Sequence, residues 1–198
     1  MYTGVRQQDS ATHRALVEAV AQDDVQAVAD LLLAGADING IVVGDGTALI
    51  VAARRGRLDL VTWLLDRGAD PNLAVPGDGN PIIMAARGGH AAVVSLLLDR
   101  GASIEQVVDG DENALIQASG AGRLETVKLL VSRGADVNAR IRVNEVAQYV
   151  HAVYDNLGRR REVPVRRMNE EWRSPLSMAR RGGHDDVAAF LVSVGAQD

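Results

Sequence analysis

The chain is 198 residues long, 47% hydrophobic but only 3% aromatic, and carries a net charge of −5. It has no cysteine, which excludes disulfides and thiol catalysis, and its acidic balance argues against general binding to nucleic-acid phosphates. No stretch approaches the roughly 18 apolar residues that span a bilayer, and residues 1–10 lack the layout of a signal peptide, so we expect a soluble, cytoplasmic protein with no membrane insertion.

A Gly-Ala pair returns along the chain at a fixed interval. The pairs are Gly35-Ala36, Gly68-Ala69, Gly101-Ala102, Gly134-Ala135 and Gly195-Ala196; the first four are 33 residues apart and the last interval is 61. Alanines that end an apolar-x-x-Ala signature keep the same intervals, at Ala19, Ala52, Ala85, Ala118 and Ala179. A period of 33 is typical of helical repeat arrays. We therefore predict a single-domain, all-α repeat solenoid over residues 1–198, with units at about 10–40, 41–73, 74–106, 107–139 and 173–198 and an insertion at about 140–172.

Helix start and stop signals recur inside each unit. Good N-cap residues precede the first helices, at Thr47, Asn80, Asn113 and Ser174, and Pro81 and Pro175 follow at the first helical position. Glycines between the two helices of a unit supply a left-handed turn. Asp23 stands in the first unit where later units have glycine, so we expect its turn to be the least regular.

The stretches after these caps carry a family likeness. Residues 47–52, 80–85, 113–118 and 174–179 are similar to a Thr-Pro-Leu-His-x-Ala box that lacks its His, and Asp-x-Asn closes three units, at Asp37/Asn39, Asp70/Asn72 and Asp136/Asn138. On these motifs the chain resembles the ankyrin-repeat family over residues 10–139 and 173–196. The resemblance implies five helix-turn-helix units joined by β-hairpin fingers, with one finger enlarged by the insertion.

Two runs, residues 81–90 and 171–180, also look like the C-terminal ankyrin arrays of bacterial antirepressor-type membrane metallopeptidases. Twenty of the 21 basic residues are Arg, a composition that favours a bacterial source. On this resemblance the chain is a detached binding part or a stand-alone relative.

The insertion can be read in two ways. Alternating apolar residues on either side of a turn at Tyr154–Arg159 indicate an extended β-hairpin. The alternative is a helix, because Val146, Val150, Val153, Tyr154 and Leu157 have helical spacing. We favour the hairpin because lengthening a finger disturbs the helix stack least. Arg159, Arg160 and Arg161 are interpreted as a solvated loop, a site for an acidic partner or a contact with nucleic acid, in that order of preference.

No motif in the chain indicates catalysis, and we expect no cofactor and no metal. The histidines are scattered, and the family resemblance implies that His90 and His184, in inter-helix turns, make structural hydrogen bonds. The segments Gly44–Gly46, Gly77–Asn80 and Gly110–Asn113 superficially resemble calcium loops, but their repetition marks finger turns with too few carboxylates.

The resemblance implies a non-catalytic protein-interaction module that binds a protein partner through finger tips, exposed first-helix positions and the insertion. The positions are Val43, Asp45, Arg54, Arg55, Pro76, Asp78, Arg87, Asp109, Asp111, Glu112, Arg173 and Arg181, together with Tyr149, Tyr154, Arg159, Arg160 and Trp172. The competing interpretations are that the charges reflect only turn chemistry and helix ends, and that Trp172 packs on the last unit. Alternative functions are a regulatory or inhibitory accessory domain of an enzyme and a structural spacer. We expect a monomer unless the insertion or the last unit self-associates.

Overall fold

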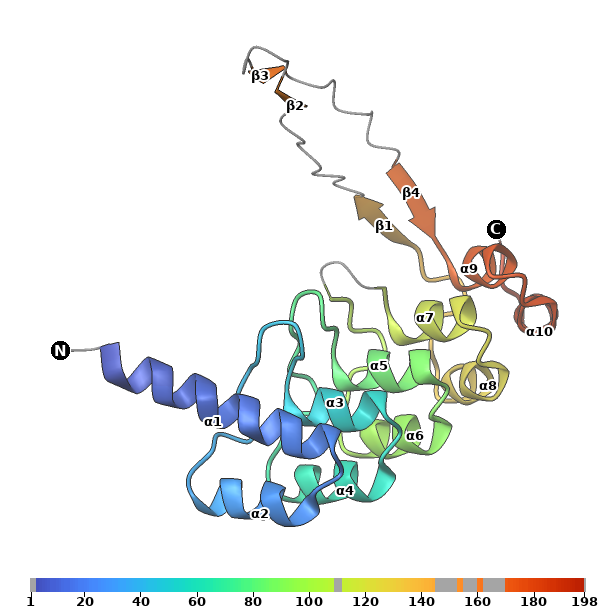
Figure 1. Cartoon of the computed structure of the whole chain (residues 1–198). Helices are drawn as coiled ribbons and strands as arrows, with labels where there is room; N and C mark the ends of the chain where they lie inside the picture. Colours follow the sequence, from blue (N-terminus) through green and yellow to red (C-terminus); the bar gives the residue numbers. More distant parts are fainter. Residues whose placement is uncertain (1–2, 109–111, 145–152, 155–159, 162–169, 198) are drawn as a thin grey trace.

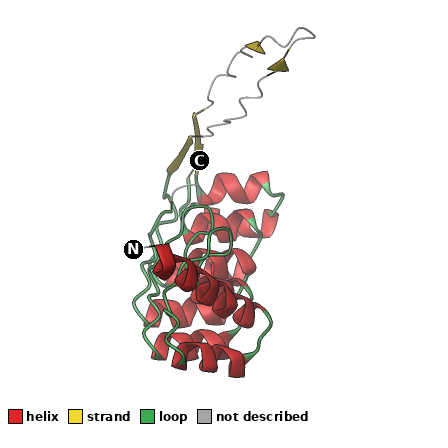
Figure 2. Ribbon diagram, turned by 60° about the vertical axis from the view of Figure 1, so that its left-hand side comes forward, coloured by secondary structure: helices red, strands yellow, loops and turns green. Residues whose placement is uncertain are grey.

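The chain forms consecutive pairs of helices stacked side by side in the computed structural model (Figure 1). The structure describes residues 3–108, 112–144, 153–154, 160–161 and 170–197. The first helices of the pairs are α1 (Thr3–Ala21), α3 (Ala48–Arg54), α5 (Pro81–Gly88), α7 (Ala114–Gly120) and α9 (Pro175–Arg181). The second helices are α2 (Val25–Leu33), α4 (Leu58–Asp66), α6 (Ala91–Asp99), α8 (Leu124–Ser132) and α10 (Asp185–Ser193). Figure 2 shows the helices stacked, with the long loops between pairs gathered along one edge.

The predicted N-caps are confirmed. The side chains of Thr47, Asn80, Asn113 and Ser174 accept hydrogen bonds of 2.9–3.2 Å from the backbone N–H three residues later. Pro81 and Pro175 occupy the first helical position. Ser174 also forms a reciprocal capping box with Ser177. Each of these first helices therefore begins where its sequence provides a cap.

The core runs continuously through the stack and depends on small side chains in the first helices. Residues 48–53 of α3 are at most 2% exposed, and residues 81–86 of α5 are buried as well. Because alanine permits close approach, α3 packs on α5, α5 on α7 and α7 on α9. The second helices bury only one face, as with Leu60, Val61 and Leu64 of α4. In α3 and α5, little apart from the C-terminal ends is thus left for a partner to touch.

The turn of the first pair is more regular than its sequence predicts. Asp23 has φ +60°, close to the +70° of Gly56 and the +69° of Gly122, which occupy the same place in later units. Aspartate tolerates the left-handed region better than most residues with a side chain. The expectation of an irregular turn at Asp23 is therefore wrong at the level of the backbone.

The loops between units carry β-bridges, and the insertion begins and ends in paired strands. Val42 bridges Gly46 and Val75 bridges Gly79. Strand β1 (Ile141–Asn144) pairs antiparallel with β4 (Glu170–Arg173), and β2 (Val153–Tyr154) pairs antiparallel with β3 (Arg160–Arg161). The helical alternative is wrong at Val153 and Tyr154, which lie in a strand; the remainder of that predicted helix lies outside the described residues.

Candidate interaction surface

A ladder of side-chain hydrogen bonds fixes each inter-unit loop against the next. Asn72 Nδ2 donates to the Gly101 carbonyl at 2.9 Å, and Asn72 Oδ1 accepts from the Ser103 N–H at 2.8 Å. Asn39 and Asn138 make the equivalent pair of bonds. The aspartate two residues earlier accepts from the backbone N–H of each asparagine at 2.8–2.9 Å. The Asp-x-Asn motif therefore serves the stacking of the loops.

A second ladder connects the first helices at their C-terminal ends. His90 Nε2 lies 3.0 Å from the Arg54 carbonyl oxygen, and His184 Nε2 lies 3.1 Å from that of Gly120. Arg123 takes the place of the histidine in the unit between and donates to the Arg87 carbonyl at 3.1 Å. The predicted structural role of His90 and His184 is confirmed.

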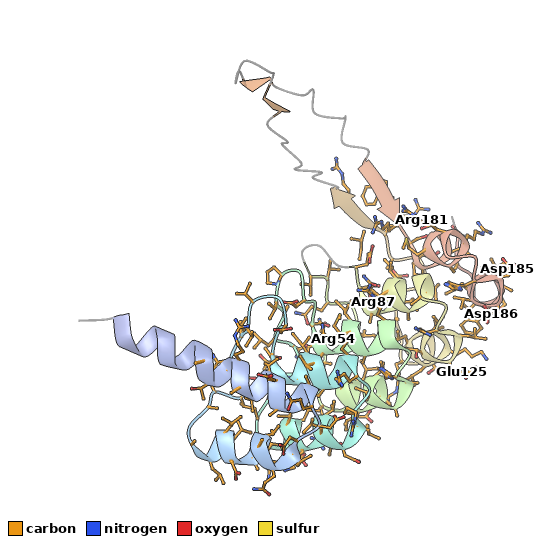
Figure 3. All side chains as sticks on the ribbon, viewed as in Figure 1. Arg54, Arg87, Glu125, Arg181, Asp185 and Asp186 are labelled. Atoms are coloured by element: carbon orange, nitrogen blue, oxygen red, sulfur yellow. The ribbon has the colours of Figure 1, made fainter. Side chains whose placement is uncertain are left out.

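The exposed positions of the first helices lie at these same ends. Arg54, Arg55, Arg87 and Arg181 are exposed, as the sequence predicts. Figure 3 shows Arg54, Arg87 and Arg181 following one another along the stack of first helices. Within the described residues the side chains of Arg54, Arg55 and Arg87 make no hydrogen bond or ion pair. They are available to a partner without breaking an internal contact.

Exposed apolar side chains mark the inter-unit loops. Val43 is 91% exposed, Val107 is 49% exposed, and Asp45 beside Val43 is exposed. Asp78 differs from its predicted exposure, because it is 9% exposed and its Oδ2 accepts from the Gly44 N–H of the neighbouring loop at 3.2 Å. Asp78 therefore joins two loops. Asp111 lies outside the described residues.

A buried ion pair stands where the insertion leaves the stack. Glu112 is 4% exposed; its Oε1 accepts from Arg173 Nη1 and its Oε2 from Gln117 Nε2, both at 2.5 Å. The predicted exposure of Glu112 is therefore wrong, since its carboxylate is enclosed by two donors. The sequence does hold a signal for this pair, because Glu112 and Arg173 occupy the repeat position where earlier units have Gly46 and Gly79.

Of the aromatic residues assigned to binding, Trp172 and Tyr154 lie in described strands. Trp172 is 58% exposed and lies opposite Arg142 in the β1–β4 ladder, which favours the binding interpretation over packing on the last unit. Tyr154 pairs with Arg160 across the β2–β3 ladder. Tyr149 and Arg159 lie outside the described residues.

Two further observations bear on chemistry and placement. In the part of the chain that the structure describes, no three His, Cys, Asp or Glu residues are grouped to hold a metal ion. None of the described helices is both long and apolar enough to cross a membrane.

Comparison with known proteins adds the family. A family model described as ankyrin repeats, three copies, matches residues 3–75 and again residues 49–141, which together make up more than half of the chain. No curated protein matches it. The match does not extend to the metallopeptidase-linked arrays suggested by residues 81–90 and 171–180. Ankyrin repeats are generally protein-protein interaction modules. The chain, with its repeated caps, loops and stacked helix pairs, belongs to the ankyrin-repeat family.

Proposed function

We propose that this chain is a non-catalytic interaction module of five ankyrin units, which binds a protein partner through its loop tips, its first-helix ends and the base of an enlarged finger at residues 140–172. The observation that carries the proposal is the exposure of Val43 and Trp172, at 91% and 58%, along the same edge as the charged loop tips. Single exposed apolar residues are common on protein surfaces, so the proposal depends on the position of these two on the inter-unit loops and on the enrichment of Trp among interface hot spots.

The enlarged finger is supported by the register of the two ladders. Ile141 pairs with Arg173 and Val153 pairs with Arg161. The same number of residues separates Ile141 from Val153 as separates Arg161 from Arg173. Equal separations are what one continuous hairpin requires, since a net bulge would make them differ. The 61-residue interval between the last two Gly-Ala pairs gives this finger its extra length.

The proposal is tested by isolating a partner and then measuring its affinity. Tagged full-length chain and a variant lacking residues 142–168 are each used to recover proteins from a lysate of the source organism. A partner recovered by the full chain is purified and titrated against Trp63→Phe protein, in which Trp172 is the only tryptophan. We expect Trp172 emission to shift to shorter wavelength on binding, because a partner removes water from its ring.

Matched variants distinguish binding through the proposed surface from nonspecific hydrophobic association. Val43→Ala and Trp172→Ala should each weaken binding, with Trp172→Ala costing about 2 kcal/mol if it is a hot spot. Leu33→Ala is the control, because Leu33 is 87% exposed but lies at the end of α2. Equal loss of affinity in Leu33→Ala and Val43→Ala would move the binding site away from the loops. A chain that recovers no specific partner would be a structural spacer instead.

The alternative of an inhibitory accessory domain is decided by the same titration. If the partner is an enzyme, its activity is measured with and without the chain. The resemblance to metallopeptidase-linked arrays stays a sequence prediction, on which this proposal does not depend.

A further inference from the structure

Three arginines occupy one repeat position at the ends of the first helices. Arg54 ends α3, Arg87 lies in the last turn of α5, and Arg181 ends α9. Gly120 holds the corresponding place on α7, where no side chain is present. We name Arg54, Arg87 and Arg181 the arginine row; Figure 3 shows it crossing the stack.

Helix-end electrostatics alone does not account for this row. Cations stabilise helix C-termini in general, and the second helices α4, α6 and α8 are likewise followed by Arg67, Arg100 and Arg133. Those arginines have internal partners: Arg100 pairs with Asp66 at 2.7 Å, Arg133 with Asp99 at 2.8 Å, and Arg67 lies over the Trp63 ring at 3.6 Å from its centroid. Within the described residues Arg54 and Arg87 make no such contact.

Exposed acidic side chains begin several second helices, among them Asp59 of α4 in the same unit as Arg54. Figure 3 places Glu125, Asp185 and Asp186 at the starts of α8 and α10, away from Arg54 and Arg87. All three acidic residues are exposed. Within the described residues Arg54 and Arg87 have no internal acidic partner, so their guanidinium groups attract negative groups locally even on a chain whose net charge is −5.

The distance between neighbouring arginines sets the spacing of the acidic groups that can bind them. Packed helices lie about 8–10 Å apart, and an extended chain advances about 3.3 Å per residue. One unit of the stack therefore corresponds to about three residues of an extended partner. Arg54 and Arg87 are one unit apart, and Arg87 and Arg181 are two units apart because Gly120 intervenes.

We propose that Arg54 and Arg87 of the arginine row bind an extended acidic segment of the partner, with carboxylates at its first and fourth residues. This inference rests on the proposed function and names the chemistry of the partner. Arginine suits the task because its planar guanidinium binds carboxylates in bidentate geometry.

The test uses labelled synthetic peptides and fluorescence anisotropy. The probe is a Gly/Ser peptide with Glu at positions 1 and 4, and the control peptide has the same composition with its two Glu residues adjacent. We expect the probe to bind more tightly than the control. The double variant Arg54→Ala/Arg87→Ala should weaken probe binding roughly tenfold, since an exposed ion pair contributes up to roughly fivefold in affinity. Arg100→Ala/Arg133→Ala removes the same charge from the second helices and should change the affinity less than twofold.

Two results would overturn the inference: equal affinity for the two peptides, or an equal loss in the two double variants, since either would show only general attraction between opposite charges. Titration of the partner recovered above separates this failure from failure of the proposed function. A partner that binds Arg54→Ala/Arg87→Ala as tightly as the unaltered chain leaves the interaction module standing and removes the arginine row from its site. Absence of any partner together with absence of probe binding would contradict both.

Discussion

Backbone conformation at single turn residues sets much of the geometry between helices. Gly122 and Gly183 both have positive φ, at +69° and +71°, yet their surroundings differ. A Cβ on Gly122 would lie 2.5 Å from Nδ1 of His184, whereas a Cβ on Gly183 would meet nothing within 4 Å. The two positions thus separate backbone strain from crowding.

We expect Gly183→Ala to lower the free energy of unfolding by about 1 kcal/mol, the cost of a left-handed L-residue. Gly122→Ala should lower it by more, because the added methyl displaces the His184 ring from the Gly120 carbonyl. Urea denaturation measures both. The control is the same Gly122→Ala change made in a His184→Ala protein. If Gly122→Ala still lowers the free energy of unfolding by more than Gly183→Ala does in that protein, crowding against the ring is not the cause.

Asp23 offers the reverse substitution. Asp23→Gly relieves left-handed strain but removes the ion pair with Arg57, whose side chain is 48% exposed. Exposed pairs contribute only about 0.2–1 kcal/mol, so we expect stability to stay level or rise by up to about 1 kcal/mol. Arg57→Ala measures the contribution of the pair by itself. A loss well above 1 kcal/mol in Asp23→Gly would mean that the pair outweighs the strain.

The strands of the insertion are held to the stack by the Glu112–Arg173 pair, whose side chains are 6% and 18% exposed. Removing one partner of a buried pair leaves the other charge uncompensated. We expect Glu112→Gln and Arg173→Gln each to destabilise the chain by about 3 kcal/mol, and the double variant to lose clearly less than the sum of both. Chemical denaturation of all four proteins completes the cycle. Strictly additive losses would show that the two side chains act independently.

Sequence predicts the elements well because caps and glycines act locally. Thr47, Asn80, Asn113 and Ser174 each need only their own helix to be recognised. The burial of Asp78 and Glu112 depends instead on contacts with the neighbouring unit, and their sequence neighbours place them at an exposed loop tip. Exposure was thus predicted correctly for the arginines at the ends of the first helices, and wrongly for Asp78 and Glu112, whose carboxylates bind neighbouring segments.

Each helix pair of the stack contacts only its neighbours. A substitution that breaks the contact between two pairs should therefore loosen the pairs next to it most. Asn138→Ala breaks the ladder between α8 and the last pair, and we expect faster hydrogen exchange mainly in residues 175–197. Asn72→Ala breaks an interior step and should speed exchange on both sides of it. Mass spectrometry of peptides after hydrogen exchange measures the exchange rate along the chain in both variants. Uniform faster exchange throughout the Asn138→Ala protein would indicate all-or-none unfolding in place of nearest-neighbour behaviour.

Asn138 also carries a consequence for the order of folding. Its ladder bonds span 57 and 59 residues, compared with 29 and 31 for those of Asn72. Doubling a loop raises its closure entropy by about 0.6 kcal/mol. We therefore expect α9 and α10 to dock on α8 more slowly than the earlier helix pairs dock on one another. On this expectation the stack from α1 to α8 forms first, and the long insertion closes only when α9 and α10 join it.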